Sequence, residues 1–199
     1  APTNAGSCAV TGRVAEANYA GETNGVLVVS KADQTIDFPA LGGQIATNEL
    51  ELAATASSGL PVSFVLVQGP ATLAGMGLSF TGAGEVAVAA QQDGDANWCP
   101  APGVTNVFAV DKAAAEVALN NLTQTYDGTA RMASAATEPP SLAVEITYDG
   151  SPCAPTNAGS YAVTGTVADA IYQGSATGTM EIAQAPAEVT LNDLAQTYD

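Results

Sequence analysis

Cysteine is the most reactive residue type in this sequence, and it occurs at three separate positions, Cys8, Cys99 and Cys153. The chain has no histidine, which excludes the Ser–His and Cys–His pairs of nucleophilic enzymes and any zinc site with a histidine ligand. Three scattered cysteines are also too few for a four-thiolate zinc site. Disulfide formation is the chemistry left to them, and it requires an oxidising compartment. Cys153 either stays free or pairs with a neighbouring chain.

An aspartate-rich run is the second candidate site. Asp93, Asp95 and Asn97 follow the pattern D-x-D-x-N, which supplies the first three ligand positions of a calcium-binding loop. The glycine expected at the sixth position is Trp98, and no glutamate stands at the twelfth. The pattern therefore favours a polar turn, with a calcium site as the weaker alternative.

The other acidic residues indicate surface charge rather than catalysis. The chain has 20 Asp and Glu residues against 4 Lys and Arg residues, for a net charge of −16. Nucleic-acid binding needs clusters of cations, and no spacing gathers an acid and a base as an active site requires. We therefore expect no enzyme, no nucleic-acid partner and no resident cofactor. Divalent cations could bridge exposed carboxylates between modules, with Asp37, Glu49 and Glu51 as contributors.

Asn121 is the candidate for glycosylation, because it begins the acceptor pattern N-L-T. The same stretch recurs later in the chain, where Asp193 takes the place of Asn121. Since the repeat does not keep the asparagine, an unmodified side chain is the favoured interpretation.

Strict alternation of apolar and polar residues predicts β-strands. It is clearest at 104–110, 142–148 and 161–167. Residues 113–119 are rich in helix formers, but their repeat at 186–191 carries Pro and Thr, so we expect strands in both. No apolar run approaches the roughly 18 residues that a spanning helix needs, so no membrane insertion is expected in this segment.

Two internal repeats organise the chain. Residues 1–32 match 154–185 at 18 of 32 positions, and residues 115–127 match 187–199 at 10 of 13 positions, both without gaps. The two offsets are 153 and 72 positions. They define one module type of 72 residues and a different module between its copies.

This arithmetic predicts four parts: 1–32 as the C-terminal part of one module, 33–114 as a second module type, 115–186 as a complete copy of the first type, and 187–199 as the first strand of a further copy. Both ends then fall inside modules, which must be completed by a longer ordered chain or by neighbouring subunits. Exchange of 187–199 between subunits leaves the equivalent of 128–153 unsupplied, so a longer chain is the simpler explanation.

The middle module contains about seven short strands, which is typical of an immunoglobulin-like sandwich of two antiparallel sheets. We expect these strands at 34–38, 49–55, 62–67, 71–74, 77–81, 84–91 and 104–110. The predicted core is Phe38, Leu52, Phe64, Leu66, Phe80, Val86, Val88 and Phe108, with Trp98 covering one end.

The order of strands brings two cysteines to one joint. Strands at 8–15 and 23–30 pair as a hairpin, which places Cys8 at the end that faces the middle module. The loop 92–103 precedes the last strand of that module and carries Cys99 toward the hairpin. We therefore predict a disulfide between them, with two unpaired thiols as the alternative. It requires Cα atoms within about 7 Å of each other.

Several stretches resemble known repeat families. QTIDFPAL and LPVSFVLVQGPATLAGMGLSFTGAGEVAVAAQQDGDANW resemble the immunoglobulin-like repeats of very large bacterial secreted and surface proteins. VALNNLTQTYDGTA, EITYDGS, PTNAGSYAVTGTV and YQGSATGTMEIA resemble the MBG/YDG-type repeats that accompany them. The resemblance implies an all-β, extracellular or cell-surface chain of tandem immunoglobulin-like β-sandwich modules, without catalytic residues. For the MBG-like module it implies either a small antiparallel sandwich or a β-grasp-like sheet.

These observations predict a structural segment of a long extracellular bacterial fibre, stalk or filament. Its partners are neighbouring modules or copies of itself, head to tail, joined by short linkers at 30–32, 111–113 and 183–185. The alternative is an adhesin-type module that binds glycans or surface proteins. That function would need exposed aromatic residues on one set of loops, whereas Tyr126 and Tyr172 recur in the repeats and therefore indicate structure.

Overall fold

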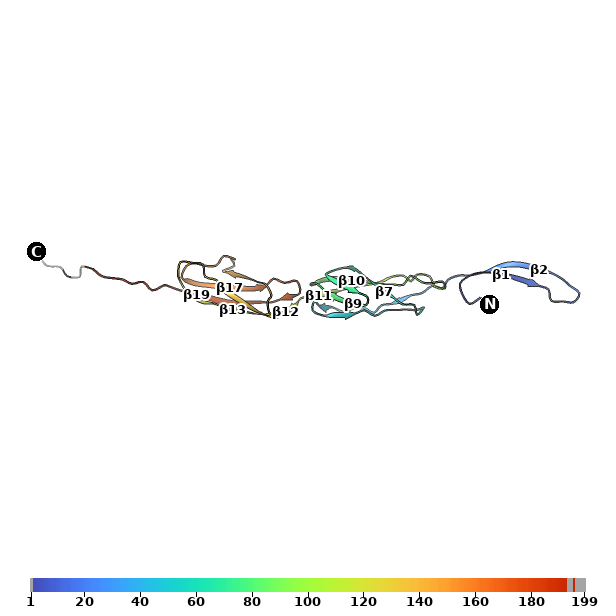
Figure 1. The fold of residues 1–199 in the computed structure, drawn as a ribbon, viewed down its shortest axis with the longest axis horizontal. Helices are drawn as coiled ribbons and strands as arrows, with labels where there is room; N and C mark the ends of the chain where they lie inside the picture. Colours follow the sequence, from blue (N-terminus) through green and yellow to red (C-terminus); the bar gives the residue numbers. More distant parts are fainter. Residues whose placement is uncertain (1, 193–194, 196–199) are drawn as a thin grey trace. The chain divides into compact units, whose positions relative to one another are not determined.

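The computed structural model describes residues 2–192 and residue 195, in which strands are joined by turns and loops (Figure 1). The chain divides into two compact units, Ala1–Lys112 and Ala113–Asp199. No helix occurs among the described residues, and so none that could cross a membrane. The all-β prediction is confirmed. For the MBG-like module, the strands of residues 113–192 form the small-sandwich alternative.

The first unit begins with a β-hairpin of β1 (Gly6–Arg13) and β2 (Glu22–Val29). The strands pair antiparallel along their whole length, from Gly6 opposite Val29 to Arg13 opposite Glu22. Among the described residues, no further strand pairs with this hairpin.

The rest of the first unit is a β-sandwich. One sheet has the order β4 (Gln44–Ile45), β11 (Val104–Asp111), β10 (Gly84–Gln91) and β7 (Ser63–Gln68). The other has the order β5 (Glu49–Glu51), β9 (Gly77–Phe80) and β8 (Ala71–Ala74). A short pair, β3 (Ile36–Asp37) and β6 (Thr55–Ala56), completes the unit.

Two details of this sandwich differ from the prediction. The predicted strand at 49–55 is divided into β5 and β6, which pair in different sheets. The two-residue strand β4 was not expected, and it pairs parallel to β11, so the larger sheet is not wholly antiparallel. Such a pair joins segments about sixty residues apart, and the alternation within each segment carries no sign of it.

The core of the sandwich contains most of the predicted residues. Buried side chains are Phe38, Leu52, Phe80, Val86, Val88 and Phe108, as expected, together with Leu78 and Val110. Phe64 and Leu66 are only half-buried, because β7 is an edge strand of its sheet. Phe64 still packs against Phe38, with ring centroids 5.4 Å apart.

The second unit is a smaller sandwich. Its main sheet has the order β14 (Thr123–Thr125), β19 (Ser175–Ala183), β17 (Gly159–Val167) and β16 (Val144–Tyr148), with β14 parallel to β19. The pair β13 (Glu116–Asn120) and β15 (Ser134–Glu138) covers it, since β13 contacts β17 and β19. The pair β12 (Ala113–Ala114) and β18 (Tyr172–Gln173) closes one end. The core comprises Ala133, Tyr148, Val163, Met180 and Ile182.

The two copies of the ambiguous A-E-V segment behave differently. Residues 113–119 form β12 and most of β13, so the strand prediction is confirmed there. The prediction of a strand at 186–191 is wrong for this structure. A strand needs a partner for its backbone groups, and no described strand lies beside this stretch. Residues 193–194 and 196–199 of the predicted 187–199 segment lie outside the described residues.

Candidate functional site

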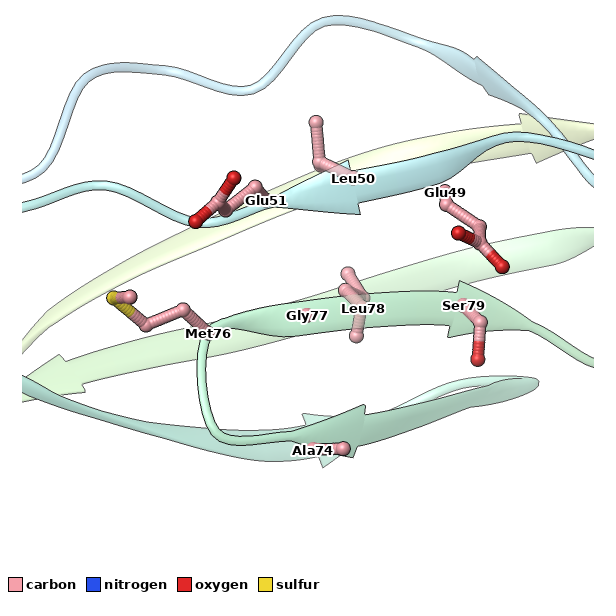
Figure 2. Close-up of a pocket in the computed structure, with 8 residues that line it drawn as sticks. All are labelled: Glu49, Leu50, Glu51, Ala74, Met76, Gly77, Leu78 and Ser79. Carbon is pink, nitrogen blue, oxygen red and sulfur yellow. The ribbon is translucent and has the colours of Figure 1, made fainter.

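An open hollow of about 620 Å³ lies over β5, β8 and β9 (Figure 2). Glu49 and Glu51 lie two residues apart on β5, opposite Ser79 and Gly77 of β9. In Figure 2 the two carboxylates lie at either end of this stretch of β5, and Gly77 adds no side chain beside them. The arrangement offers carboxylate and hydroxyl oxygens, which are ligands for hard cations.

Of the three carboxylates predicted to bridge divalent cations, Glu49 and Glu51 share this hollow. Asp37 lies on β3 and lines a neighbouring hollow together with Glu51. Within the described part of the chain, no group of three or more His, Cys, Asp or Glu side chains could hold a metal ion. Bridging by divalent cations stays a prediction.

The aspartate-rich loop forms a joint between the hairpin and the sandwich inside the first unit. The carboxylate Oδ1 of Asp95 accepts hydrogen bonds from the backbone N–H groups of Asn97, at 2.8 Å, and Trp98, at 2.9 Å. The amide of Asn97 reaches the hairpin: its Oδ1 accepts from the N–H of Ala5 at 2.9 Å, and its Nδ2 donates to Oδ1 of Asn4 at 3.3 Å. The side chains of Asp95 and Asn97 therefore hold a turn and the joint. Calcium at Asp93, Asp95 and Asn97 stays a prediction.

Backbone pairing reinforces this joint. Ala32 N–H donates to the carbonyl of Asn97 at 2.9 Å, and Cys99 N–H donates to the carbonyl of Ala32 at 2.8 Å. Lys31 Nζ donates to the carbonyl of Asp95 at 2.6 Å. The linker after β2 thus runs beside the loop that carries Cys99 and is held to it by these hydrogen bonds.

Gly94 permits the tight course of this loop. Its φ is +75°, and a Cβ there would lie 2.4 Å from the carbonyl oxygen of Trp98. Any side chain would clash with backbone in a conformation that L-residues rarely adopt. Trp98 itself is half-buried, and its backbone forms a bridge with Ala32, so it lies at the joint.

The cysteines have unbonded thiols in this structure. Cys8 lies on β1 opposite Leu27, and Cys99 lies in the joint loop with its Sγ 4.0 Å from the carbonyl oxygen of Lys31. Both are half-buried and belong to the first unit. The disulfide between them stays a prediction. Cys153 is exposed, and its pairing with another chain is likewise untested.

Asn121 follows β13 with a φ of +59° and is exposed. Its Nδ2, the atom that would carry a sugar, donates a hydrogen bond to Oγ of Ser134 at 3.1 Å. Glycosylation at this position stays a prediction.

The repeated hairpin has one register in both of its copies. Gly6 pairs with Val29 in the first copy. The residues 153 positions later, Gly159 and Ile182, pair in the same way between β17 and β19. The repeat seen in the sequence is therefore also a repeat of the backbone pairing.

The MBG domain family matches residues 1–33 and residues 115–186, slightly more than half of the chain. The chain belongs to the MBG domain family. The first matched segment contains β1 and β2, called the MBG hairpin below; the second, called the complete MBG module, contains β13 to β19. No curated protein sequence matches the chain.

Solved structures with partial likeness to the chain include two cadherins and an enzyme. Drosophila N-cadherin EC1-4 is 10% identical over 83% of this chain and 52% of that chain, with a TM-score of 0.34. Mouse cadherin-23 EC22-24 is 12% identical over 90% and 74%, with a TM-score of 0.31. An endo-fucoidan hydrolase of glycoside hydrolase family 107 is 14% identical over 92% and 35%, with a TM-score of 0.32. The chain thus spans about half of the N-cadherin structure and about a third of the hydrolase.

Proposed function

We propose that this chain is a structural segment of a long extracellular fibre, stalk or filament built from MBG modules and β-sandwich modules. Membership of a repeat family and the recurrence of the MBG hairpin within the chain support a role that depends on repetition. In repeat proteins, each unit gains stability from its contacts with neighbouring units.

The joint in the first unit is the observation that carries this proposal. Hydrogen bonds link the joint loop to residues 4–5 and 31–32: Asn97 Oδ1 accepts from Ala5 N–H, Asn97 Nδ2 donates to Asn4, two bonds run along the backbone at Ala32, and Lys31 Nζ donates to Asp95. A binding module on a flexible tether would not need such a joint, whereas a load-bearing array gains stiffness from it.

The charge of the chain suits the same role. A net charge of −16 makes copies repel each other, and this opposes sideways aggregation of exposed strand edges. Divalent cations at paired carboxylates such as Glu49 and Glu51 would reduce the repulsion where modules meet.

The alternative, an adhesin-type module for glycans or surface proteins, needs gathered aromatic side chains. In the described part of the chain, the exposed aromatic side chains are Tyr19 and Tyr126, which belong to different units. Trp98 is half-buried at the joint. The structural role therefore has the stronger support.

Immunogold electron microscopy of intact cells with antibodies against residues 33–114 tests this proposal. We expect label outside the cell at intervals along fibres, and a denatured mass far above that of this segment. Label confined to fibre tips would favour the adhesin, and label only inside the cell would overturn both functions. The same samples, run with and without reductant, report whether Cys153 links chains.

A further inference from the structure

The four-stranded sheet of the first unit has an apolar outer face, on the side away from the sandwich core. Val86 and Val88 of β10 lie in the core, so Ala87 and Ala89 point to the other side, because successive residues of a strand alternate. Residues paired directly across strands share a side, and these partners extend the face over β7 and β11. The outer face comprises Ile45, Val65, Val67, Ala87, Ala89 and Val107.

The outer face has a valley along β10 and valines on both sides of it. Ala87 pairs with Val107 of β11, Ala89 pairs with Val65 of β7, and Val67 lies where the register of β7 against β10 shifts. The alanines are 3% and 8% exposed, whereas Val65, Val67 and Val107 are 43%, 57% and 56% exposed. The short alanine side chains therefore lie below the valines, and the described part of the chain leaves the valines open to solvent.

The outer face is uncharged along its middle, although the chain has a net charge of −16. Glu85 of β10 and Asp111 of β11 lie at one end of this side of the sheet, whereas Gln91 and its partner Ser63 lie at the other. A cationic partner would find no carboxylate among the residues of the outer face, and a sugar ring would find no aromatic side chain there. The face therefore fits an apolar surface that carries little charge.

A second copy of the outer face meets these requirements. Two sheets pack face to face with their strands roughly aligned and their side chains interdigitated, so valines of one copy can enter the alanine valley of the other. In a two-fold contact with antiparallel strands, the acidic end of each face lies over the neutral end of its partner. This arrangement separates Glu85 and Asp111 of one copy from the same residues of the other, and so avoids like-charge contacts.

The size of the outer face indicates a weak contact. With strands about 4.8 Å apart and a rise of about 3.3 Å per residue, the four strands cover on the order of 400 Å². Two copies would bury on the order of 800 Å², whereas stable interfaces bury roughly 1,200–2,000 Å². One pair of faces should therefore associate weakly, and many such pairs along two arrays would add their effects through avidity.

We propose that the outer face binds the same face of a second copy of this chain, in a two-fold contact with antiparallel strands. Such a contact is isologous, because both copies use the same residues. It joins side chains on sheet faces and leaves the exposed strand edges, which the net charge protects, unpaired. This inference goes beyond the proposed function, because it concerns how copies lie side by side and not where the protein works.

Sedimentation velocity of the 199-residue chain, up to about 1 mM, tests the contact. Wild type should show a monomer–dimer equilibrium that is tighter in about 0.5 M than in about 0.05 M NaCl, because salt screens repulsion between acidic chains. Val107→Glu should weaken association at least about tenfold, because the contact would then bury an unpaired carboxylate. Val107 lies on the inner strand β11, so its effect does not report on pairing through the edge of β7.

Val28→Glu is the matched control. Val28 is an exposed valine of β2, and its repeat equivalent is Glu181, which is exposed on β19. The substitution adds the same charge to the same chain, at a strand position where the other copy already carries glutamate. It should leave association unchanged. Circular dichroism of both variants checks that the strands are retained.

Methyl NMR of the wild-type chain over a dilution series provides a readout that does not depend on any variant. The methyl signals of Val65, Val67 and Val107 should shift with concentration, and those of Val28 should not. A chain that stays monomeric at about 1 mM in about 0.5 M NaCl would overturn the proposal and leave the outer face to a partner of different composition. So would association that both variants weaken equally, or concentration-dependent shifts that spare the three valines.

Discussion

The MBG hairpin and strands β17 and β19 of the complete MBG module have the same register but different surroundings. In one, the apolar face is open to solvent; in the other, β13 and its following turn cover the face. The comparison separates two contributions to the fold. Local sequence is enough to specify the hairpin, because alternation and turn residues act over a few positions. Burial of its face needs a segment some forty residues away.

The largest expected difference between the two regions concerns their apolar side chains. Met180→Ala in the complete module should lower the free energy of unfolding of the second unit by about 2–5 kcal/mol, because it leaves a cavity in a closed core. The same truncation at the equivalent position, Leu27→Ala, should cost the first unit less than about 1 kcal/mol. Urea unfolding of the full chain, followed by NMR signals from each unit, checks both. Equal losses would contradict the idea that the hairpin face is open.

A second pair of variants compares two equivalent glycines, Gly178 of β19 and Gly25 of β2, by adding a side chain at each. Gly178→Val should destabilise the second unit by about 1–3 kcal/mol, because its side chain would overlap Leu122 and Leu119. Gly25→Val should change stability by no more than about 0.5 kcal/mol. Thermal unfolding of the two variants beside wild type measures the difference. If Gly25→Val lowers stability as much as Gly178→Val does, another side chain already occupies the space beside Gly25.

Removing the side-chain amide of Asn97 should weaken the joint between the hairpin and the sandwich. Asn97→Ala removes the acceptor for Ala5 N–H and the donor to Asn4, which should cost about 1–2 kcal/mol locally. Hydrogen exchange of the Ala5 amide should become roughly tenfold faster or more. Asn24→Ala, which removes only an exposed hydrogen bond from Thr11, is the matched control. It should leave exchange at Ala5 unchanged.

The smallest expected effect concerns Asp127, which lies in the turn after β14 in the complete MBG module. The hydroxyl of Thr129 donates to Oδ1 of Asp127 at 2.7 Å, and the Thr129 N–H donates to the same oxygen at 2.9 Å. These bonds, with the Arg131 guanidinium 2.7 Å from Oδ2, lower the pKa of the Asp127 carboxyl. The charged carboxylate therefore stabilises the turn fully at pH values above the ordinary pKa of aspartate. This contribution is lost as the pH falls through the lowered pKa of Asp127.

Carboxyl-carbon NMR titration measures this pKa directly. Thr129→Val should raise it, because the hydroxyl donor is lost while the backbone donor remains. Arg131→Gln should raise it by less. A pKa of Asp127 that neither variant moves would show that the turn is open in solution.

Sequence reasoning was most successful where the information is local or repeated. The β class, most strand positions and six of the eight predicted core residues of the middle module follow from alternation, which depends only on neighbouring positions. Sequence reasoning predicted that Phe64 and Leu66 are fully buried, but both are half-buried. Alternation shows only which side of the strand a residue faces. It does not show whether its strand lies at the centre or the edge of a sheet.

The joint was visible in the sequence only in part. The D-x-D-x-N pattern indicates a turn, because Asp and Asn side chains accept hydrogen bonds from backbone two or three residues on, as Asp95 does. Nothing in the pattern shows that Asn97 instead reaches Asn4 and Ala5. Their separation of more than ninety residues makes this contact a property of the folded unit.

The sequence by itself determined the repeat and the presence of the MBG hairpin, because these depend on spacing along the chain. Tertiary structure alone showed that β13 and the turn after it cover the apolar face of β17 and β19. It also decided that β4 and β14 lie parallel to their partners, and that the Asn97 side chain is the group that bonds the hairpin at the joint. The physical reason is that burial and long-range pairing depend on what another segment places against a surface. The two copies of the hairpin, identical at 18 of 32 positions, differ in burial because only the second is described together with the segment that covers it.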